Sequence, residues 1–478
     1  MPRRTKIIAT IGPASESEAG IKDLIEAGMD VARVGLAHGT LEEALVKYHA
    51  IRKVAAEADK PIGIMVDLPG PKVRAGNMPE EGLPIEQGEQ LLLRPSHDEP
   101  SVKGAITVDH EGLLNDLHAG DRVTFGDGAA MAQVIDRQTD ALLIRVTHGG
   151  VLQGRPGVHI PSDRLRLSSP TSEDLRLLDA FVEVGVDMVA VSFVRSAHDV
   201  RRVGVEPHPR GPMVVAKIET RAAVDNLDGI IEASGAIMVA RGDLGAEMPI
   251  EELPHLQKRI LERCITLGRP AITATQMLES MITSPSPTRA EASDIANAVF
   301  DGSSAVMLSG ESAIGRDPGN AVATMARIAA RADDEFDYDN WGSKVHAIAS
   351  SMAPSIDDTV TNSMTNAAWR AALESNASAI ICITRTGFTA RQIARFRPQA
   401  KILGFSRDDR VIHQLGLSWG VSPYHLEGDY TDEAMVYRTV EQAREAGEVR
   451  RGDLVCVLSG APGYPGQATD TLRLVPVT

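Results

Sequence analysis

The sequence contains few cysteines. Only three occur in 478 residues, and Cys264, Cys382 and Cys456 lie far apart with no paired spacing. This pattern gives little support to a disulfide framework or a zinc site, because both need residues at characteristic intervals. We expect the three thiols to lie in the hydrophobic core.

Long apolar runs are also missing. No uninterrupted stretch reaches the roughly 18 apolar residues that cross a bilayer. The opening MPRRTKIIATIG has too short an apolar stretch before Gly12 and Pro13 for a signal peptide. We therefore expect a soluble, cytoplasmic protein with no membrane partner.

No segment collects charge of one sign. The chain has 49 Lys and Arg against 65 Asp and Glu, a net charge of -16 that is spread along its length. This balance disfavours nucleic-acid binding, because nucleic-acid backbones are negative. Hydrophobic residues make up 43% and charged residues 24%, which excludes disorder and a collagen-like repeat. At roughly 150 residues per domain, the length suggests about three domains.

The familiar nucleotide motifs are absent. No Gly-Lys pair occurs, so there is no Walker A loop, and no Rossmann glycine fingerprint follows a strand. The pattern of two histidines bracketing a glutamate is missing too. Any nucleotide must therefore bind by another geometry.

Short β-branched runs alternate with amphipathic stretches through most of the first two thirds of the chain. Helices such as Leu253–Leu267 and Arg289–Phe300 separate the runs. Eight parallel strands alternating with helices predict an α/β protein built on a (β/α)8 TIM barrel. The expected strands are Lys6–Thr10, Val31–Leu36, Ile62–Asp67, Met188–Phe193, Val214–Ile218, Ile237–Arg241, Ala271–Thr275 and Ala305–Ser309.

Two further units accompany the barrel. From about Gly70 to Pro161 the chain is rich in Gly, Pro and short alternating segments, which predicts an inserted β domain. After Tyr338, helices and strands that include Asp357–Ser375 and Ala379–Thr384 predict a smaller doubly wound α/β domain. The predicted boundaries are 1–69 with 162–338 for the barrel, 70–161 for the insertion and 339–478 for the C-terminal domain.

Polar residues end nearly every predicted barrel strand, and barrel enzymes place their active sites at this carboxyl end. Charges held there are costly unless they pair or bind a ligand, so we favour a binding site over a salt-bridged rim. The residues are Arg33, Asp67, Ser192, Lys217 with Glu219, Arg241 with Asp243, Thr275 with Gln276, and Ser309 with Glu311.

Glu219 and Asp243 follow adjacent strands, so their carboxylates can converge on one hard cation, Mg²⁺ or Mn²⁺. Lys217 lies two residues before Glu219, so both side chains point the same way. Gly242 lets backbone N–H groups approach an anion closely. The set predicts a small, multiply charged anionic substrate, and either phosphoryl transfer or an enolate fits it.

The motifs TKIIATIGP, VAKIE, MVARGDLGAEMP, ITATQMLESMI, PTRAEASDIANAVFDGSSAVMLSGES and LRLVPV closely resemble the pyruvate kinase family, essentially end to end. The resemblance implies a TIM barrel interrupted by a small β-barrel lid and followed by a regulatory α/β domain. It implies transfer of the phosphoryl group of phosphoenolpyruvate to ADP, giving pyruvate and ATP in the last step of glycolysis. It places the chain among phosphotransferases of the alcohol-acceptor class, usually homotetramers with allosteric coupling.

The resemblance also assigns roles to individual residues. Lys217, Arg33 and Thr275 would be catalytic, with Arg33 on the transferring phosphoryl group and Lys217 on the transition state and enolate. Gly242 and Thr275 would hold the substrate carboxylate, and Asp243 would lie in the same substrate site. Metal binding would fall to Glu219 and Asp243, which would ligate Mg²⁺ or Mn²⁺, and nucleotide binding to His38 and Arg74.

One group of departures concerns the family's activating K⁺. Gly35 and Ala37 replace residues with side-chain oxygens, while Asp67 retains its carboxylate. Leu68 stands where a threonine is usual and Lys72 where a glutamate is usual. In family members resembling this pattern a lysine ammonium stands in for K⁺, so we predict that K⁺ is not required. The alternative for Lys72 is a solvated loop residue.

Glu173 stands where a lysine that contacts nucleotide phosphates is usually found. An acid beside those phosphates should repel them. Either another cation substitutes, or Glu173 turns away as a first-turn residue of a helix capped by Ser172 or Thr171, which we favour. The first case leaves open a divergent paralogue that uses phosphoenolpyruvate with a different or weaker acceptor.

The stretch TRTGFTA forms a predicted strand-to-helix turn, where hydroxyls and N–H groups can bind an anion. Its position matches the family's loop for phosphorylated effectors, which implicates Thr384, Thr386, Gly387 and Thr389. The alternative is a threonine-rich helix cap that binds no effector, which would have the same sequence.

Two other functions compete with the kinase. A pyruvate-enolate lyase on the same barrel would need the carboxylate pair but not Arg33, Arg74 or the lid. A non-catalytic regulatory paralogue predicts loss of residues such as Lys217 and Glu219, and these are present.

Overall fold

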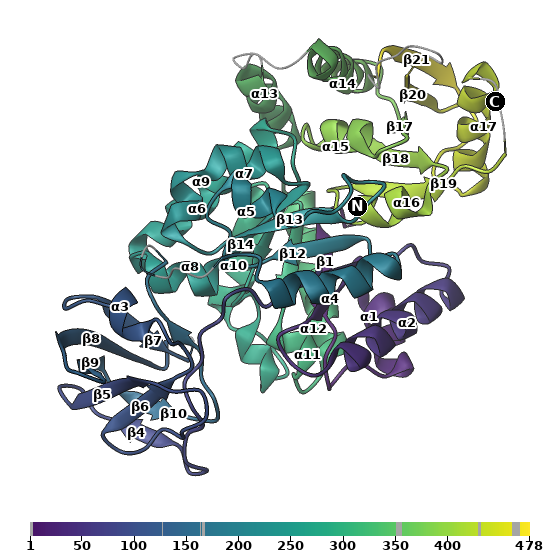
Figure 1. The fold of residues 1–478 in the computed structure, drawn as a ribbon. Coiled ribbons are helices and arrows are strands. Elements are labelled where there is room, and N and C mark those ends of the chain that lie inside the picture. The colour runs from purple at the N-terminus through teal and green to yellow at the C-terminus, as the bar shows by residue number, and fades with distance from the viewer. Residues whose placement is uncertain are drawn as a thin grey trace.

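The computed structural model describes residues 3–126, 128–162, 164, 168–349, 356–428, 432–460 and 469–478. In the described part of the chain the strands form a closed barrel, two small sheets in the insertion, and a C-terminal five-stranded sheet. The insertion projects from the barrel as a separate lobe, and the C-terminal sheet lies on the other side of the barrel (Figure 1). None of the described helices is long and apolar enough to cross a membrane.

The barrel contains all eight predicted strands. They run parallel, and β1 pairs with both β2 and β16, which closes the ring. The strands are β1 Lys6–Thr10, β2 Val31–Gly35, β3 Gly63–Asp67, β12 Met188–Val191, β13 Met213–Ile218, β14 Ala236–Ala240, β15 Ala271–Ala274 and β16 Ala305–Leu308. Several end one or two residues earlier than predicted, because the chain turns there into the loops that form the site.

The barrel helices begin where side chains cap their first N–H groups. Thr40 and Thr171 each take part in a reciprocal capping box, and Gly28 ends the first helix with a left-handed φ of 115°. The helices are α1 Glu18–Ala27, α2 Leu41–Glu57, α4 Ser172–Glu183, α5 Ala197–Arg201, α6 Arg221–Asp225, α7 Leu227–Ala233, α8 Arg241–Glu247, η1 Ile250–Glu252, α9 Leu253–Thr266, η2 Glu279–Ile282, α10 Arg289–Phe300, α11 Gly310–Ala313 and α12 Pro318–Asp334.

Two apolar layers hold the barrel together. The interior is filled by methionine and β-branched side chains such as Met65, Met188 and Met238. The outer layer packs the helices against the opposite faces of the same strands, through residues such as Leu24 and Phe181. Alternation along each strand supplies both layers, as it does in a packed (β/α)8 core.

The insertion is a β domain as predicted, but its larger sheet is open. Six strands form the mixed sheet β11-β7-β8-β9-β5-β6, and β4 pairs only with β10. This sheet is a mixed half-barrel in the place of the expected small β-barrel lid: its edge strands β11 and β6 do not pair with each other, and β11 is two residues long. The elements are β4 Leu83–Ile85, β5 Gln90–Pro95, β6 Ala105–Val108, α3 Leu113–Asp116, β7 Arg122–Phe125, β8 Ala130–Arg137, β9 Leu142–His148, β10 Gly150–Leu152 and β11 Val158–His159.

The C-terminal domain is doubly wound, as predicted. Helices α14, α15 and α16 pack on one face of the sheet β19-β18-β17-β20-β21, and α17 packs on the other. Only β21 is antiparallel. The elements are α13 Tyr338–Ala349, α14 Ile356–Glu374, β17 Ala379–Ile383, α15 Phe388–Ala394, β18 Lys401–Ser406, α16 Asp409–Leu415, β19 Val421–His425, α17 Asp432–Glu445, β20 Leu454–Ser459 and β21 Thr471–Pro476.

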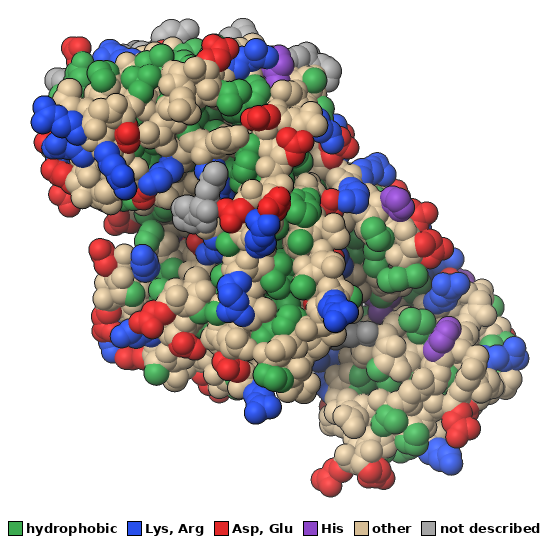
Figure 2. Space-filling view, turned by 180° about the vertical axis from the view of Figure 1, so that it is seen from behind, with side chains coloured by type: hydrophobic (Ala, Val, Ile, Leu, Met, Phe, Trp, Pro, Cys, Tyr) green, Lys and Arg blue, Asp and Glu red, His purple; other side chains and the backbone are tan. Residues whose placement is uncertain are grey.

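Two other expectations can be compared with the structure. Cys264, Cys382 and Cys456 are free and buried, which confirms the prediction of core thiols. Acidic and basic side chains are interspersed over the face seen in Figure 2, in agreement with charge that is spread along the chain. The exact domain boundaries at 69/70, 161/162 and 338/339 stay a prediction.

Candidate active site

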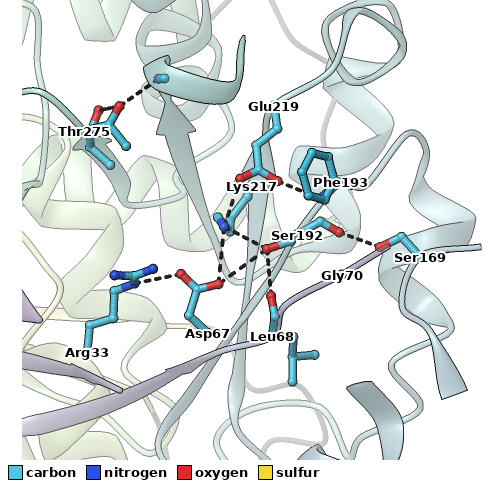
Figure 3. Close-up of polar contacts among 12 residues, drawn as sticks. Arg33, Asp67, Leu68, Gly70, Ser169, Ser192, Phe193, Lys217, Glu219 and Thr275 are labelled. Atoms are coloured by element: carbon cyan, nitrogen blue, oxygen red, sulfur yellow. Dashed lines mark hydrogen bonds and ion pairs between the residues drawn. The ribbon is translucent and has the colours of Figure 1, made fainter. Parts of the chain in front are cut away.

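Lys217 lies buried at the carboxyl end of the barrel. Its Nζ atom donates to Ser192 Oγ at 2.7 Å and to Asp67 Oδ1 at 3.3 Å, and it pairs with Glu219 Oε1 at 2.9 Å. Asp67 also accepts from Arg33 Nε at 2.7 Å. Strands β2, β3 and β13, together with the residue after β12, thus converge on one group of charges (Figure 3).

The loops beside these strands hold the same groups in place. Phe193 donates its backbone N–H to Glu219 Oε2 at 2.6 Å, and Ser192 donates its hydroxyl to the carbonyl of Leu68 at 2.7 Å. Phe193, Thr275 and Gln276 follow barrel strands with positive φ values of 54°, 65° and 55°. Side chains rarely adopt this conformation, and proteins retain it mainly at functional sites.

The charges in this group do not balance. Burial lowers the pKa of Lys217, but Asp67, Glu219 and Asp243 raise it more, so it lies above its ordinary value. Burial opposes ionisation of Asp67, but Lys217 and Arg33 hold its pKa below the usual range. Burial raises the pKa of Glu219 to about 7, with Asp243 adding to the rise and Lys217 opposing it. The two cations, Lys217 and Arg33, are outnumbered by three carboxylates. This excess of negative charge favours either a proton on Glu219 or binding of an additional cation.

The donor set fits a divalent metal ion. Glu219 Oε1 is buried, and the Lys217 ammonium at 2.9 Å is the partner that the described part of the chain gives it. No group of three or more His, Cys, Asp or Glu among the described residues could hold a metal. A cation would therefore take Glu219 and Asp243 and complete its shell with substrate and water, as Mg²⁺ commonly does.

Helix α8 begins directly after β14 and carries Gly242 and Asp243. Arg241 fixes the start of this helix by donating to the carbonyl of Thr275 at 2.7 Å and pairing with Asp294 at 2.7 Å. The Gly242 N–H donates to Thr275 Oγ1 at 2.8 Å. Thr275 and Gly242, from neighbouring strand ends, therefore form one contact, as their proposed shared role requires.

The insertion covers this end of the barrel. A cavity of about 230 Å³ is lined by residues of both domains, among them Lys72 and Gly157 of the insertion and Gly242, Asp243 and Gln276 of the barrel. Such a cavity, with apolar walls and a few convergent charges, is typical of a small-ligand site.

Family models cover both of the larger domains. The model described as pyruvate kinase, barrel domain, matches residues 2–322, and the model of the pyruvate kinase alpha/beta domain matches residues 362–475. The chain belongs to the pyruvate kinase family. The pyruvate kinase of Bacillus licheniformis is 38% identical over 470 residues, which cover 97% of this chain and 79% of that protein.

Two further pyruvate kinases extend the comparison. That of Staphylococcus aureus strain MRSA252 is 37% identical over 476 residues, covering 99% of this chain and 80% of the relative. The crystal structure of a pyruvate kinase from Cryptosporidium parvum superposes with a TM-score of 0.89 at 32% identity, covering 100% of this chain and 96% of the other.

The residues expected to contact nucleotide phosphates lie near other cations. His38 is exposed, and burial of part of its ring, followed by the charges of Arg74, Lys72 and Arg33, lowers its pKa. These side chains therefore share one positive region near the carboxyl end of the barrel. Lys72 is exposed and passes close to Gly157, and no ion pair joins it to Asp67 in the described residues.

Glu173 is exposed and pairs with a residue of its own helix, and it lies in the first helical turn as expected from the sequence. Thr171 is the helix cap, and Glu173 lies in the first turn of α4, where it pairs with Arg176 at 2.6 Å. The next acidic residue is the one that faces inward: Asp174 accepts from the N–H of Gly70 at 3.0 Å, where the chain enters the insertion.

The predicted effector loop uses its hydroxyls internally. Thr384 Oγ1 accepts from the N–H of Gly387 at 3.0 Å, and Thr386 Oγ1 accepts from that of Phe388 at 3.4 Å. Thr389 Oγ1 contacts another threonine hydroxyl at 2.5 Å. The structure thus brings the four predicted residues into one turn, and their binding role stays a prediction.

Sequence reasoning missed several residues that position this site. Thr10 Oγ1 accepts from Arg33 Nη1 at 2.9 Å, and Ser169 donates to the carbonyl of Ser192 at 2.5 Å. Glu247 accepts from both the N–H and the hydroxyl of Ser162, where the insertion returns to the barrel. Thr10 ends the first strand and could have been found by the same rule as Arg33. The other contacts cross long sequence separations and leave no local signal.

The pKa of Glu219 predicts how stability depends on pH. A carboxyl whose folded pKa is raised stabilises the folded state below its unfolded pKa, near 4.5, and this contribution is lost as the pH rises through about 7. Without divalent metal, the wild-type unfolding temperature should therefore fall relative to that of Glu219→Gln as the pH rises from 5 to 8. Excess Mg²⁺ at pH 8 should raise the wild-type value more than the variant's.

Differential scanning calorimetry at matched ionic strength measures this difference. The exposed Glu57→Gln variant is the control, and its profile should follow the wild type. A wild-type minus Glu219→Gln difference that stays constant across this range would contradict the assignment.

Proposed function

We propose that this chain catalyses the last step of glycolysis, transferring the phosphoryl group of phosphoenolpyruvate to ADP to give pyruvate and ATP. The observation that carries the proposal is the buried Lys217 ammonium beside the carboxylates of Glu219 and Asp243. Such a cluster stabilises an anion whose charge shifts from phosphate to enolate oxygen during reaction. Membership of the pyruvate kinase family supports the same reaction.

Each neighbouring residue has a role consistent with its contacts. Asp67 and Thr10 fix the Arg33 guanidinium, which can neutralise the oxygens of the transferring phosphoryl group. The Gly242 N–H, which donates to Thr275 here, would donate to the substrate carboxylate instead. Lys217 would oppose the negative charge that develops on the enolate oxygen.

Glu219 and Asp243 would hold Mg²⁺ or Mn²⁺, which supplies Lewis-acid stabilisation of oxygen charge when bound. His38 and Arg74 would contact the nucleotide phosphates within the positive region beneath the insertion. A pyruvate-enolate lyase would leave Arg33 and these cations without a role. We therefore prefer phosphoryl transfer.

Replacement of Lys217 by Met should remove at least 99% of kcat, because its charge is needed mainly in the transition state. Affinity for phosphoenolpyruvate should change much less. A lactate-dehydrogenase-coupled assay of pyruvate release with Mg²⁺, with and without ADP, measures both parameters. Lys103→Met, on the exposed surface of the insertion, is the matched control.

Two outcomes of this assay would count against the proposal. If Lys217→Met keeps more than a tenth of wild-type kcat, the role of the ammonium is wrong. If folded wild type releases no pyruvate in an ADP-dependent manner, a different acceptor or the lyase reaction becomes the better account.

We also propose that the enzyme does not require K⁺. Gly35 and Ala37 offer no side-chain oxygen ligands, while Arg33 and Lys217 already neutralise Asp67. Lys72 adds a positive charge to the same end of the barrel, although it pairs with no carboxylate of that site in the described residues. Leu68 contributes only its carbonyl, which accepts from Ser192.

Adding KCl to a tetramethylammonium buffer at matched ionic strength should therefore change kcat/KM less than tenfold. Lys72→Glu should become dependent on K⁺, and the control Lys103→Glu should not. A rise of tenfold or more in the wild type would show that K⁺ is required.

We also propose a site for an allosteric effector in the C-terminal domain. A phosphorylated effector would bind the turn formed by Thr384, Thr386, Gly387 and Thr389, and it would shift the saturation curve for phosphoenolpyruvate. Thr384→Val should abolish that shift while leaving basal kcat unchanged; a shift that survives would remove this turn as the site. A homotetrameric assembly and a cytoplasmic location stay predictions from the family.

A further inference from the structure

A second cavity lies where the barrel meets the C-terminal domain. Its volume is about 30 Å³. On the barrel side it is lined by residues that precede β15 and β16, such as Arg269 and Gly302. It therefore lies at the amino end of the barrel, opposite the active site. On the other side it is lined by α15 and by the segment before β19.

The lining of this cavity is strongly basic. Four arginines contribute to it, and no Asp or Glu does so among the described residues. Arginines are rarely buried without an acidic partner, because removing an unpaired charge from water is costly. Arg397 donates to two backbone carbonyls and stacks on aromatic rings, and Arg269 donates to the carbonyl of Ser234. These contacts do not account for the burial of the other two arginines, Arg391 and Arg395.

Arg391 and Arg395 find only neutral acceptors in the described residues. Arg391 Nη2 donates to the carbonyl of Thr386 at 3.1 Å and to His208 Nε2 at 3.2 Å, while its Nη1 makes no hydrogen bond there. Arg395 Nη2 donates to Asn362 Oδ1 at 2.9 Å, while its Nε makes none. The two side chains are 5% and 8% exposed.

No carboxylate among the described residues offsets these two charges. Burial, together with the charge of Arg269, lowers the pKa of Arg391 to about 9, and burial lowers the pKa of Arg395 to about 10. Both values stay above neutral pH, so both guanidinium groups remain charged. Burial, together with Arg391 and Arg269, lowers the pKa of His208 to about 3, so the ring stays neutral and its Nε2 can accept from Arg391.

Two more donors along the same wall lack partners in the described part of the chain. The Ser418 hydroxyl and the Trp419 indole N–H are buried, belong to residues that line the cavity and make no hydrogen bond there. Buried donors are nearly always satisfied by protein, water or ligand. Cationic and neutral donors thus surround one small space.

We propose that this cavity binds a small inorganic oxyanion of the phosphate type. The anion would accept hydrogen bonds from Arg391, Arg395, Ser418 and Trp419, and would neutralise charge at the junction of the two domains. The volume of about 30 Å³ is roughly that of two water-sized groups, so it excludes a nucleotide, and a tetrahedral oxyanion would enter only with outward rotation of the Arg391 and Arg395 side chains. Because Arg391 also holds Thr386, occupation of the cavity would fix the neighbouring turn.

Binding of radiolabelled inorganic phosphate to the full chain tests the proposal. Equilibrium dialysis is run without divalent metal, against sodium chloride at matched ionic strength. Arg391→Gln and Arg395→Gln should each weaken phosphate binding at least tenfold, because each removes a charged donor. Arg391→Lys should restore much of the affinity. Arg444→Gln, an exposed arginine on α17, is the matched control and should bind as the wild type does.

Two further variants separate this cavity from the active site and from misfolding. Arg33→Gln removes an active-site contact for phosphate and should leave the interdomain binding in place. Trp419→Phe removes one neutral donor without changing charge and should weaken binding severalfold. Circular dichroism identifies folded variants, and basal pyruvate release serves as a second readout of folding for the cavity variants only.

Three results would overturn the proposal. Phosphate could bind no more tightly than chloride does. Folded Arg391→Gln, Arg395→Gln and Trp419→Phe proteins could all bind phosphate with wild-type affinity. All phosphate binding could disappear in Arg33→Gln, which would place the anion in the active site alone.

Discussion

The buried ammonium of Lys217 is the charge on which the arrangement of the barrel mouth depends. It fixes Asp67, which in turn aligns Arg33, and it binds Ser192, which holds the backbone where the chain leaves for the insertion. Glu219, which directly follows the same strand β13, pairs with this ammonium. One buried ammonium thereby links the ends of neighbouring strands. Water could take over these contacts only if the side chains around Lys217 moved apart.

Much of this could be predicted from the sequence because it follows from periodicity. Hydrophobic alternation located all eight barrel strands, and parallel strands place their ends together, so Lys217, Glu219 and Asp243 were expected to converge. Contacts between residues that are far apart in the sequence could not be predicted. Lys72 is an example: its side chain passes close to Gly157 and makes no ion pair with Asp67 in the described residues, and the sequence indicated neither fact. The open sheet of the insertion likewise depends on an edge pairing that no local pattern encodes.

Charge is segregated between the two ends of the barrel. In the buried cluster around Lys217, at the carboxyl end, carboxylates outnumber cations, and burial raises the pKa of Glu219. At the amino end arginines such as Arg391 and Arg395 collect without acids among the described lining residues. Each end is therefore incomplete in the opposite sense. The described residues leave both sets of charges unbalanced, and the proposed metal ion and oxyanion would complete them.

The ring closes through β1 and β16, whose residues Lys6 and Ala305 pair although almost 300 positions separate them. During synthesis the first three strands must therefore wait, with one edge of β1 unpaired, until nearly two thirds of the chain has left the ribosome. The insertion has its own apolar core and needs no such partner, so it can fold while they wait. Its place in the sequence, directly after β3, allows this unit to fold while the edges of the three-stranded sheet are still unpaired.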